Sequence, residues 1–156
     1  MLTKLSLALS GHWPWPQVLV GLLALLLPAT AGAAMPPWVY LQARDTAMYH
    51  VQVKVRDITG PAQTPGECQV VGEVVRIFRD TPGKLTTGTT VAFAVSCAKA
   101  SDSRPIGGTL WTDYDALKQA RYLEVFLNSN EHGYQVASWQ SRIIEAPTAQ
   151  PTFPRD

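Results

Sequence analysis

The stretch Tyr-His-Val-Gln-Val-Lys-Val-Arg, residues 49–56, alternates apolar and polar side chains more regularly than any other part of the chain. In an extended strand, this alternation places one set of side chains toward a core: Tyr49, Val51, Val53 and Val55. The opposite face carries the polar set: His50, Gln52, Lys54 and Arg56. The stretch therefore predicts a strand with one solvated face, and it makes His50 a surface residue rather than a catalytic base.

Four more strand-like segments and one short helix follow. The strands are predicted over Cys68–Arg79, Thr89–Cys97, Arg121–Leu127 and Tyr134–Ile144. Between the third and fourth strands, a pattern like a capping box at Thr112 predicts a helix that ends near Gln119. Three strands, a short helix and two strands is the order of a five-stranded OB-type barrel. The sequence thus predicts a mainly β fold with an OB-like barrel over residues 47–145.

The second predicted strand contains a break in its alternation. Apolar residues share one parity at Cys68 and Val70, and the other at Val75 and Ile77, with Gly72 between them. A glycine at such a change is typical of a β-bulge, which lets a strand curl into a barrel. We therefore expect a bulge at Gly72.

Several short segments resemble the netrin-like barrels, a group that includes the tissue inhibitors of metalloproteinases. They are VVGEVVRIFR at 70–79, GTTVAF at 88–93, GG at 107–108, RYLEVFL at 121–127 and GY at 133–134. The resemblance implies a secreted OB-fold module. The animal inhibitors chelate the protease metal with an N-terminal cysteine, whereas this chain has Ala34-Met35-Pro36-Pro37 after its leader. No inhibitory site residue therefore carries over.

The N-terminus has the pattern of a cleaved secretory signal. A largely apolar block, Gln17–Leu27, is followed by Pro28 and by small residues up to Ala34. The block is shorter than the ~20 residues that cross a bilayer, so residues 1–33 are predicted to be a signal peptide cleaved after Ala33. Cleavage after Ala31 or Ala34, and an uncleaved anchor, are the alternatives. The mature chain is expected in the periplasm or the extracellular medium, without a membrane span.

Two segments outside the predicted barrel lack a repeating apolar pattern. Residues 34–46, with Pro36 and Pro37, are predicted to form an extended lead into the first strand. Residues 146–156 include Pro147, Pro151 and Pro154. Their composition predicts a disordered tail that packs against no core.

The sequence contains two cysteines, Cys68 and Cys97. An even number in an exported chain favours one intramolecular disulfide; a pair of metal thiolates and a redox-active dithiol are the alternatives. Cys68 opens the second predicted strand and Cys97 closes the third. Pairing of these strands as a hairpin would bring both cysteines together on the inward face, near Val70 and Val95.

The charge of the mature chain narrows the classes of partner. All 12 acidic residues and 12 of the 13 basic residues lie beyond residue 34, so the mature chain is formally neutral. Proteins that bind nucleic acid normally present a strongly basic face to the phosphates. Neutrality therefore argues against a nucleic-acid partner, and it gives no polybasic anchor for a membrane.

Residues that could catalyse a reaction are few. His132 lies in the predicted hairpin turn Asn128–Gly133, and Asp113 and Asp115 are explained by capping of the short helix. Asp102 does not complete the spacing of a calcium loop with these two carboxylates. The sequence contains no motif of a nucleophile elbow, a phosphate-binding loop or a zinc protease. We therefore predict no catalytic residue, no metal and no cofactor.

The candidate binding residues are aromatic and basic. The aromatic candidates flank the helix and the last two strands: Trp111, Tyr114, Tyr122 and Trp139. The basic candidates are Arg76 and Arg79, on a row that acidic neighbours balance. The overall prediction is an exported, non-catalytic binding module that docks a protein partner or an envelope component. An exported enzyme of unrecognised type and a structural subunit of an envelope complex are the alternatives.

Overall fold

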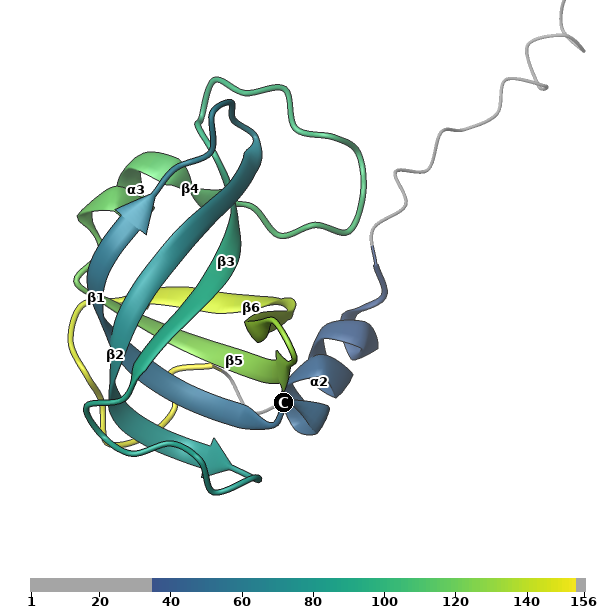
Figure 1. Cartoon of the computed structure of the whole chain (residues 1–156). Coiled ribbons are helices and arrows are strands. Elements are labelled where there is room, and N and C mark those ends of the chain that lie inside the picture. Colours follow the sequence, from purple (N-terminus) through teal and green to yellow (C-terminus); the bar gives the residue numbers. More distant parts are fainter. Residues whose placement is uncertain (1–34, 154–156) are drawn as a thin grey trace, which may run out of the picture. The chain divides into compact units, whose positions relative to one another are not determined.

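Six strands form one sheet that wraps into a nearly closed barrel (Figure 1). The structure is a computed structural model, and it describes residues 35–153. The predicted signal peptide, residues 1–33 with its cleavage site at Ala33, lies outside the described residues, as do residues 154–156.

The element order confirms the predicted OB-like architecture. The strands are β1 (Tyr49–Thr59), β2 (Gly66–Asp80), β3 (Thr90–Ala98), β4 (Thr112–Asp113), β5 (Tyr122–Asn130) and β6 (Gly133–Ile144). The helices are α2 (Pro37–Thr46) and α3 (Tyr114–Gln119), and α3 lies between the third and fifth strands. The order in the sheet is β4-β3-β2-β1-β5-β6. The two-residue strand β4, which pairs with the end of β3, is the one strand that the sequence did not predict.

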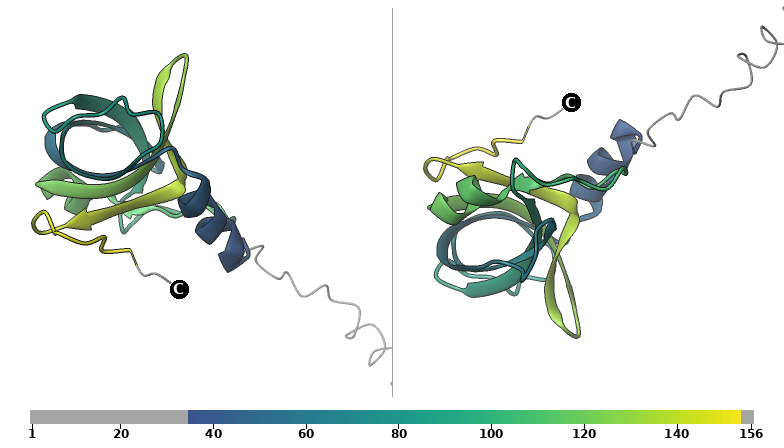
Figure 2. Two further views of the ribbon diagram at one scale, coloured as in Figure 1. Left: turned by 90° about the horizontal axis from the view of Figure 1, so that it is seen from below. Right: turned by 90° about the horizontal axis from the view of Figure 1, so that it is seen from above.

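Figure 2 looks along the barrel, where the strands curl round into a ring. β3 and β6 approach each other at the seam of this ring, but they are not neighbours in the hydrogen-bonded order. Curvature comes from three register shifts between β1 and β2. The first two leave Phe78 and Val75 as extra residues on β2, and the third leaves Arg56 as an extra residue on β1.

The predicted bulge of β2 at Gly72 is wrong in its position. Gly72 continues the buried parity from Cys68 to Val74, and the change of parity follows at Val75. Gly72 serves a close approach instead, because a Cβ atom there would lie 3.0 Å from the Cβ of Val53. A glycine lets β1 and β2 come together at this point.

The interior of the barrel is apolar, and the alternating residues of β1 fill it as predicted. Tyr49, Val51 and Val53 are fully buried, together with Leu123, Val125 and Leu127 from β5. The predicted disulfide is confirmed: Cys68 and Cys97 are bonded, with Cα atoms 5.8 Å apart, and both side chains are fully buried. Cys68 pairs with Val95 and Cys97 with Gly66, so the bridge runs diagonally across the β2–β3 ladder.

Helix α3 begins one residue later than the capping pattern predicted. The carboxylate of Asp113, rather than the hydroxyl of Thr112, caps the helix and accepts a hydrogen bond of 2.8 Å from the amide of Ala116. A carboxylate at the N-cap also interacts favourably with the helix dipole. Leu117 from this short helix is fully buried in the barrel core.

The expectation of an extended lead over residues 34–46 is wrong, because Pro37–Thr46 is helical. Pro37 occupies the first turn, where a proline costs no intrahelical hydrogen bond. The other end is stabilised by Arg79 of β2, whose Nη1 donates to the carbonyl oxygens of Arg44, Asp45 and Ala47. A long-range contact from β2 therefore satisfies the end of the helix, and no local pattern announces it.

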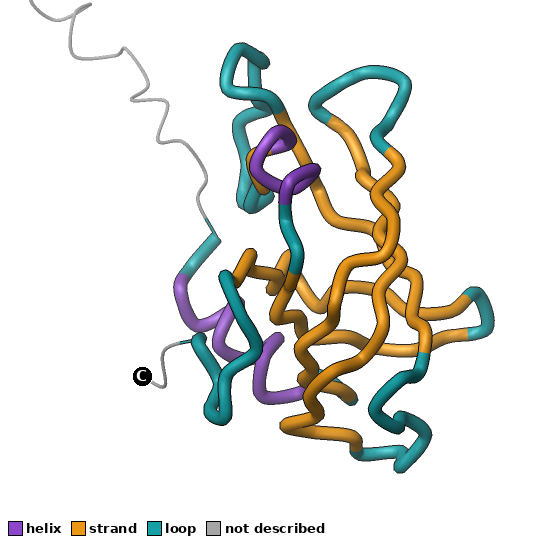
Figure 3. Tube along the Cα trace, turned by 90° about the vertical axis from the view of Figure 1, so that its left-hand side faces the viewer, coloured by secondary structure: helices purple, strands orange, loops and turns teal. Residues whose placement is uncertain are grey.

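The expectation of a disordered tail over residues 146–156 is wrong for its described part. Residues 146–153 run back across the outside of β1 and β5, beside α2 (Figure 3). We call these eight residues the strap. Phe153 at its end is 8% exposed and packs with Phe126, Ala137 and Ala47 in a second apolar cluster outside the barrel. The prolines prevent regular structure but leave the strap free to bond to side chains of the sheet.

Candidate functional site

The outer face of β1 and β5 is buried at His50 and Gln52, although the sequence predicted a solvated face. Lys54 and Arg56, the other two residues of that face, are exposed as predicted. His50 pairs with Phe126 across the ladder, and Gln52 pairs with Glu124. His50 is 6% exposed, and Gln52 and Glu124 are not exposed at all. The prediction of a surface histidine at position 50 is therefore wrong, because the strap and α2 cover this part of the sheet.

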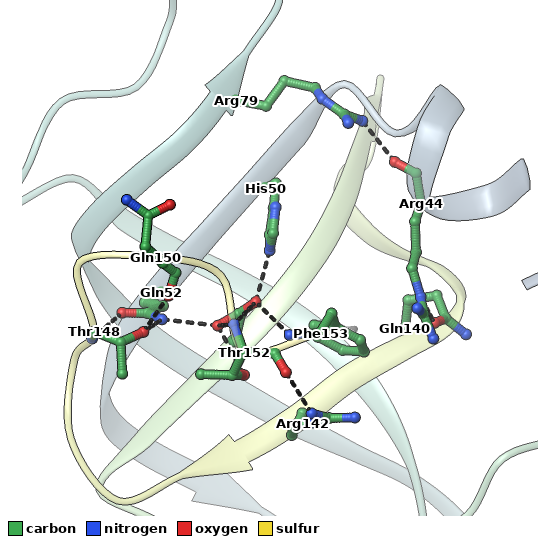
Figure 4. A network of polar contacts seen from close by, with 11 residues as sticks. Arg44, His50, Gln52, Arg79, Gln140, Arg142, Thr148, Gln150, Thr152 and Phe153 are labelled. Atoms are coloured by element: carbon green, nitrogen blue, oxygen red, sulfur yellow. Dashed lines mark hydrogen bonds and ion pairs between the residues drawn. The ribbon is translucent and has the colours of Figure 1, made fainter. Parts of the chain in front are cut away.

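Glu124 is the centre of a polar network on this face (Figure 4). Its carboxylate accepts hydrogen bonds from Nε2 of His50 at 2.9 Å and from Nε2 of Gln52 at 2.7 Å. It also accepts from the amide and the hydroxyl of Thr152, each at 3.0 Å from Oε2. No buried side-chain nitrogen or oxygen atom in residues 35–153 lacks a partner.

These donors keep Glu124 ionised. Burial would raise its pKa, but the hydrogen bonds from His50, Gln52 and Thr152 outweigh burial and lower the pKa to about 2. The carboxylate therefore remains an acceptor throughout the physiological pH range, so the Nε2–H of His50 donates to it. The His50 ring stacks on Phe126, with ring centroids 3.8 Å apart.

A cleft of about 670 Å³ lies between α2 and the strap. His50, Phe78 and Phe126 line it from the sheet, Arg44 from α2, and Phe153 from the strap. The guanidinium of Arg44 lies 4.8 Å from the centre of the Phe153 ring and donates through Nε to Gln140 at 2.6 Å. The cleft thus combines aromatic surfaces with an arginine. In residues 35–153, neither His50 nor His132 is hydrogen-bonded to the side chain of a serine, threonine or cysteine.

A loop-out in β6 connects this cleft to the barrel seam. Val125 pairs with Ser141 and Leu127 with Val136, so the four residues Ala137–Gln140 stand opposite Phe126 alone. Ser138 and Trp139 have positive φ angles, 40° and 60°, which cost energy in residues other than glycine. The loop-out buries Gln140, the partner of Arg44, and directs Trp139 into a second groove of about 530 Å³ along the seam.

Four exposed apolar side chains belong to α2, to the residues just before it, and to the loop of residues 99–111, which reaches toward α2 in Figure 2. Trp38 is 61% exposed, Ile106 90%, Leu110 47% and Met35 39%. The Tyr40 hydroxyl donates to the carbonyl oxygen of Gly108 at 2.7 Å, and the Met35 side chain lies so close to Gly108 that it leaves no room for a Cβ atom there. We call Met35, Trp38, Ile106 and Leu110 the apolar junction; Leu110 also lines the seam groove beside Trp139.

The residues predicted to bind a partner do not form one surface. Trp139 lines the seam groove, whereas Tyr114 lies against Gly60, and Tyr122 is at the start of β5. Trp111 is partly exposed just before β4. Arg76 is exposed on β2, whereas Arg79 donates hydrogen bonds to the carbonyl oxygens at the end of α2. Of these candidates, Trp139 shares the seam groove with Leu110 of the apolar junction, and Trp111 follows Leu110 in the chain.

Two signals in the sequence could have indicated the covered outer face. Phe126 falls on the outward parity of its strand, between the inward residues Val125 and Leu127. Phe153 is a large apolar residue within a tail that otherwise lacks them. An outward Phe126 and a lone Phe153 are both explained if each ring packs against a partner outside the barrel. The two rings contact each other, with centroids 5.1 Å apart.

Metal binding and membrane insertion find no support in the described residues. No group of three or more His, Cys, Asp or Glu side chains in residues 35–153 is placed to hold a metal ion. Over the same residues, neither helix has the length and hydrophobicity to span a bilayer. The chain matches neither a known protein-family model nor a curated protein. The resemblance to netrin-like barrels therefore stays a prediction.

Proposed function

We propose that the chain is an exported, non-catalytic binding module that docks a protein partner through the apolar junction. The observation that carries this proposal is the exposure of Trp38, Ile106, Leu110 and Met35 on two segments that hydrogen-bond to each other. Of the five large apolar side chains that are exposed in residues 35–153, four belong to this junction. Grouped apolar exposure on a small domain marks an interaction surface.

The composition of the junction favours a protein as the partner. Tryptophan and methionine are enriched in protein–protein interfaces, and tryptophan is a frequent source of binding energy. The formal neutrality of the mature chain removes the attraction that a nucleic acid would need. The hydrogen bond between Tyr40 and Gly108 holds the loop against α2 before a partner binds. The loop therefore loses less conformational entropy when the partner docks.

The site chemistry supports binding rather than catalysis. His50 donates to a carboxylate, stacks on Phe126 and is 6% exposed, so its ring is poorly placed to take a proton from a substrate. Both cysteines are joined in the disulfide and cannot act as nucleophiles. An enzyme would need a base within hydrogen-bond reach of an accessible nucleophile or substrate.

Export is supported by the apolar leader and by the disulfide, because disulfides persist in oxidising compartments. N-terminal sequencing of the exported protein should begin near Ala34. Recovery of a chain with intact Met1 in the membrane fraction would contradict export and favour an anchor.

The docking proposal is tested by affinity capture from the exported fraction with matched variants. The double variant Trp38→Ser/Ile106→Ser should reduce capture of a specific partner by at least about 10-fold, since each residue removes exposed apolar area. Met48→Ser is the control, because Met48 is 40% exposed and contacts Ser129 rather than the junction. Equal capture by all three proteins, or no specific partner for the unmodified chain, would contradict the proposal.

A further inference from the structure

Side chains of the sheet form hydrogen bonds to both the backbone and the side chains of the strap. Gln52 uses both ends of its amide on one residue: Oε1 accepts from the amide of Thr148 at 2.8 Å, and Nε2 donates to the Thr148 hydroxyl at 2.7 Å. Figure 4 shows this pairing beside the Glu124 network. A threonine at this position satisfies both bonds, whereas an alanine or a proline would lose at least one.

The second contact is four residues further along the strap. The amide of Thr152 lies 3.1 and 3.0 Å from the two oxygens of Glu124, and its hydroxyl donates to Oε2 at 3.0 Å. The amide of Phe153 lies 3.4 Å from Oε1. Nη1 of Arg142 donates to the carbonyl oxygen of Thr152 at 2.7 Å. The Glu124 carboxylate and the Arg142 guanidinium together select an extended backbone with a hydroxyl residue at this point.

The third contact is an aromatic anchor. The Phe153 ring packs edge-on against Phe126, and the guanidinium groups of Arg44 and Arg142 lie 4.8 and 4.7 Å from its centre. Stacking of arginine on an aromatic ring adds to the energy of burying the ring. Two polar positions and one aromatic position, at fixed spacing on an extended segment, are the way that peptide-binding grooves achieve specificity.

We propose that the outer face of β1 and β5 is a peptide-binding groove for an extended Thr-x-x-x-Thr-Phe segment. In this structure the groove holds the chain's own strap, and its ligand in trans is the strap of a second copy. A second copy is the occupant that the contacts favour, because each bond lost when one strap leaves is formed again by the incoming strap. Residues 145–147, which join β6 to the bound part of the strap, are exposed and offer a hinge for this exchange.

The groove is tested with a synthetic peptide of residues 147–156 (PTAQPTFPRD) added to the whole mature chain. The receiving chain carries Thr148→Val, Thr152→Val and Phe153→Ala. These changes weaken the binding of its own strap and leave the residues of the groove unchanged. This chain should bind the peptide at least about 10-fold more tightly than the unmodified chain, in which the strap competes at high effective concentration. A peptide with the same three changes is the matched control and should not bind.

The specificity of the groove is tested by adding Glu124→Gln to the receiving chain. Loss of the charged acceptor should weaken peptide binding by about 10- to 100-fold. Failure of the native-sequence peptide to bind a receiving chain that still shows the circular dichroism of the barrel would overturn the groove. Equal binding with Glu124→Gln would overturn the role of this carboxylate.

Binding of the strap of a second copy is tested on the unmodified mature chain. This experiment remains informative if the receiving chain fails to fold. Refolding at millimolar concentration should yield strap-exchanged dimers by size-exclusion chromatography, and refolding at micromolar concentration should yield monomers. Monomers at every concentration would overturn the second copy as the ligand. Peptide binding without any dimer would retain the groove but assign its ligand to another protein.

Discussion

Over residues 49–53 of β1 and 123–127 of β5, both faces of the ladder are buried, but different parts of the chain bury them. The inner face consists of apolar residues such as Val51 and Val125, which pack against the other strands of the barrel. The outer face consists of His50, Gln52, Glu124 and Phe126, which are covered by α2 and the strap. Alternation in a strand therefore shows which residues share a face, but it does not show whether the polar face meets water.

The difference is also one of energetics. The inner face gains stability from apolar area removed from water, which needs no particular partner geometry. The outer face buries a charge, which is favourable only while hydrogen bonds replace the lost water. The inner face should therefore tolerate changes of pH, whereas the outer face should depend on the ionisation of Glu124 and on single hydroxyl groups.

The largest expected effect comes from the barrel interior that the inner face packs against, where the disulfide joins β2 and β3. Cys97→Ser removes a bridge that links residues 29 apart in the sequence, and it should lower the free energy of unfolding by about 3–4 kcal/mol. Urea unfolding at neutral pH without reductant measures the change, and the reduced unmodified protein should match the variant. The hydrogen-exchange rates of the strap amides at neutral pH should change little, because the strap bonds to side chains of β1 and β5 whereas the bridge joins β2 and β3. A variant as stable as the parent would contradict the stabilising role of the bridge in the barrel interior.

The second effect belongs to the outer face and is seen in acid. Because the pKa of Glu124 is about 2 in the folded chain and 4.5 for an unperturbed glutamate, its stabilisation is complete above pH 4.5. It is lost as the pH falls from about 4.5 to 2, and its full size is on the order of 3 kcal/mol. Urea unfolding at successive pH values measures the loss.

Two carboxyl variants sharpen this prediction. Glu124→Gln should remove most of the acid dependence in this window, whereas Glu73→Gln should retain most of it, because an exposed ion pair contributes little to stability. Glu73 is the matched control because its pKa is also lowered, through its hydrogen bond and charge interaction with the exposed Arg56. Parallel curves for the parent and for Glu124→Gln between pH 5 and pH 2 would contradict the buried network.

The contrast between the faces also explains what could be predicted from the sequence. The barrel, the order of its main elements along the chain and the disulfide follow from local alternation, turn residues and an even number of cysteines. The outer site depends on contacts between distant positions: Gln52 and Thr148 are 96 residues apart, and Glu124 and Thr152 are 28 apart. The strap has no repeating pattern, so its composition suggested disorder. The C-terminal end of α2 likewise depends on a distant residue, Arg79 of β2.

The smallest of these effects concerns a single hydroxyl group. Thr148→Val keeps the shape of the side chain but removes the acceptor for Gln52 and the donor to the Gln150 carbonyl oxygen. It should lower the free energy of unfolding by about 1–2 kcal/mol, because each of the two hydrogen bonds contributes about 1 kcal/mol net. Thr59→Val is the control, since the Thr59 hydroxyl bonds Asp57 at an exposed position and should contribute close to nothing. Equal stability of both variants would show that the Gln52–Thr148 pair adds nothing.

The central claim is that the strap is held on the outer face by Glu124, and amide hydrogen exchange at neutral pH tests it most directly. The amides of Thr152 and Phe153, which bond the carboxylate, should exchange about 100-fold or more slowly than the amide of the exposed Ala149. Glu124→Gln should bring the three rates closer together. Exchange of Thr152 as fast as that of Ala149 in the unmodified protein would contradict the claim.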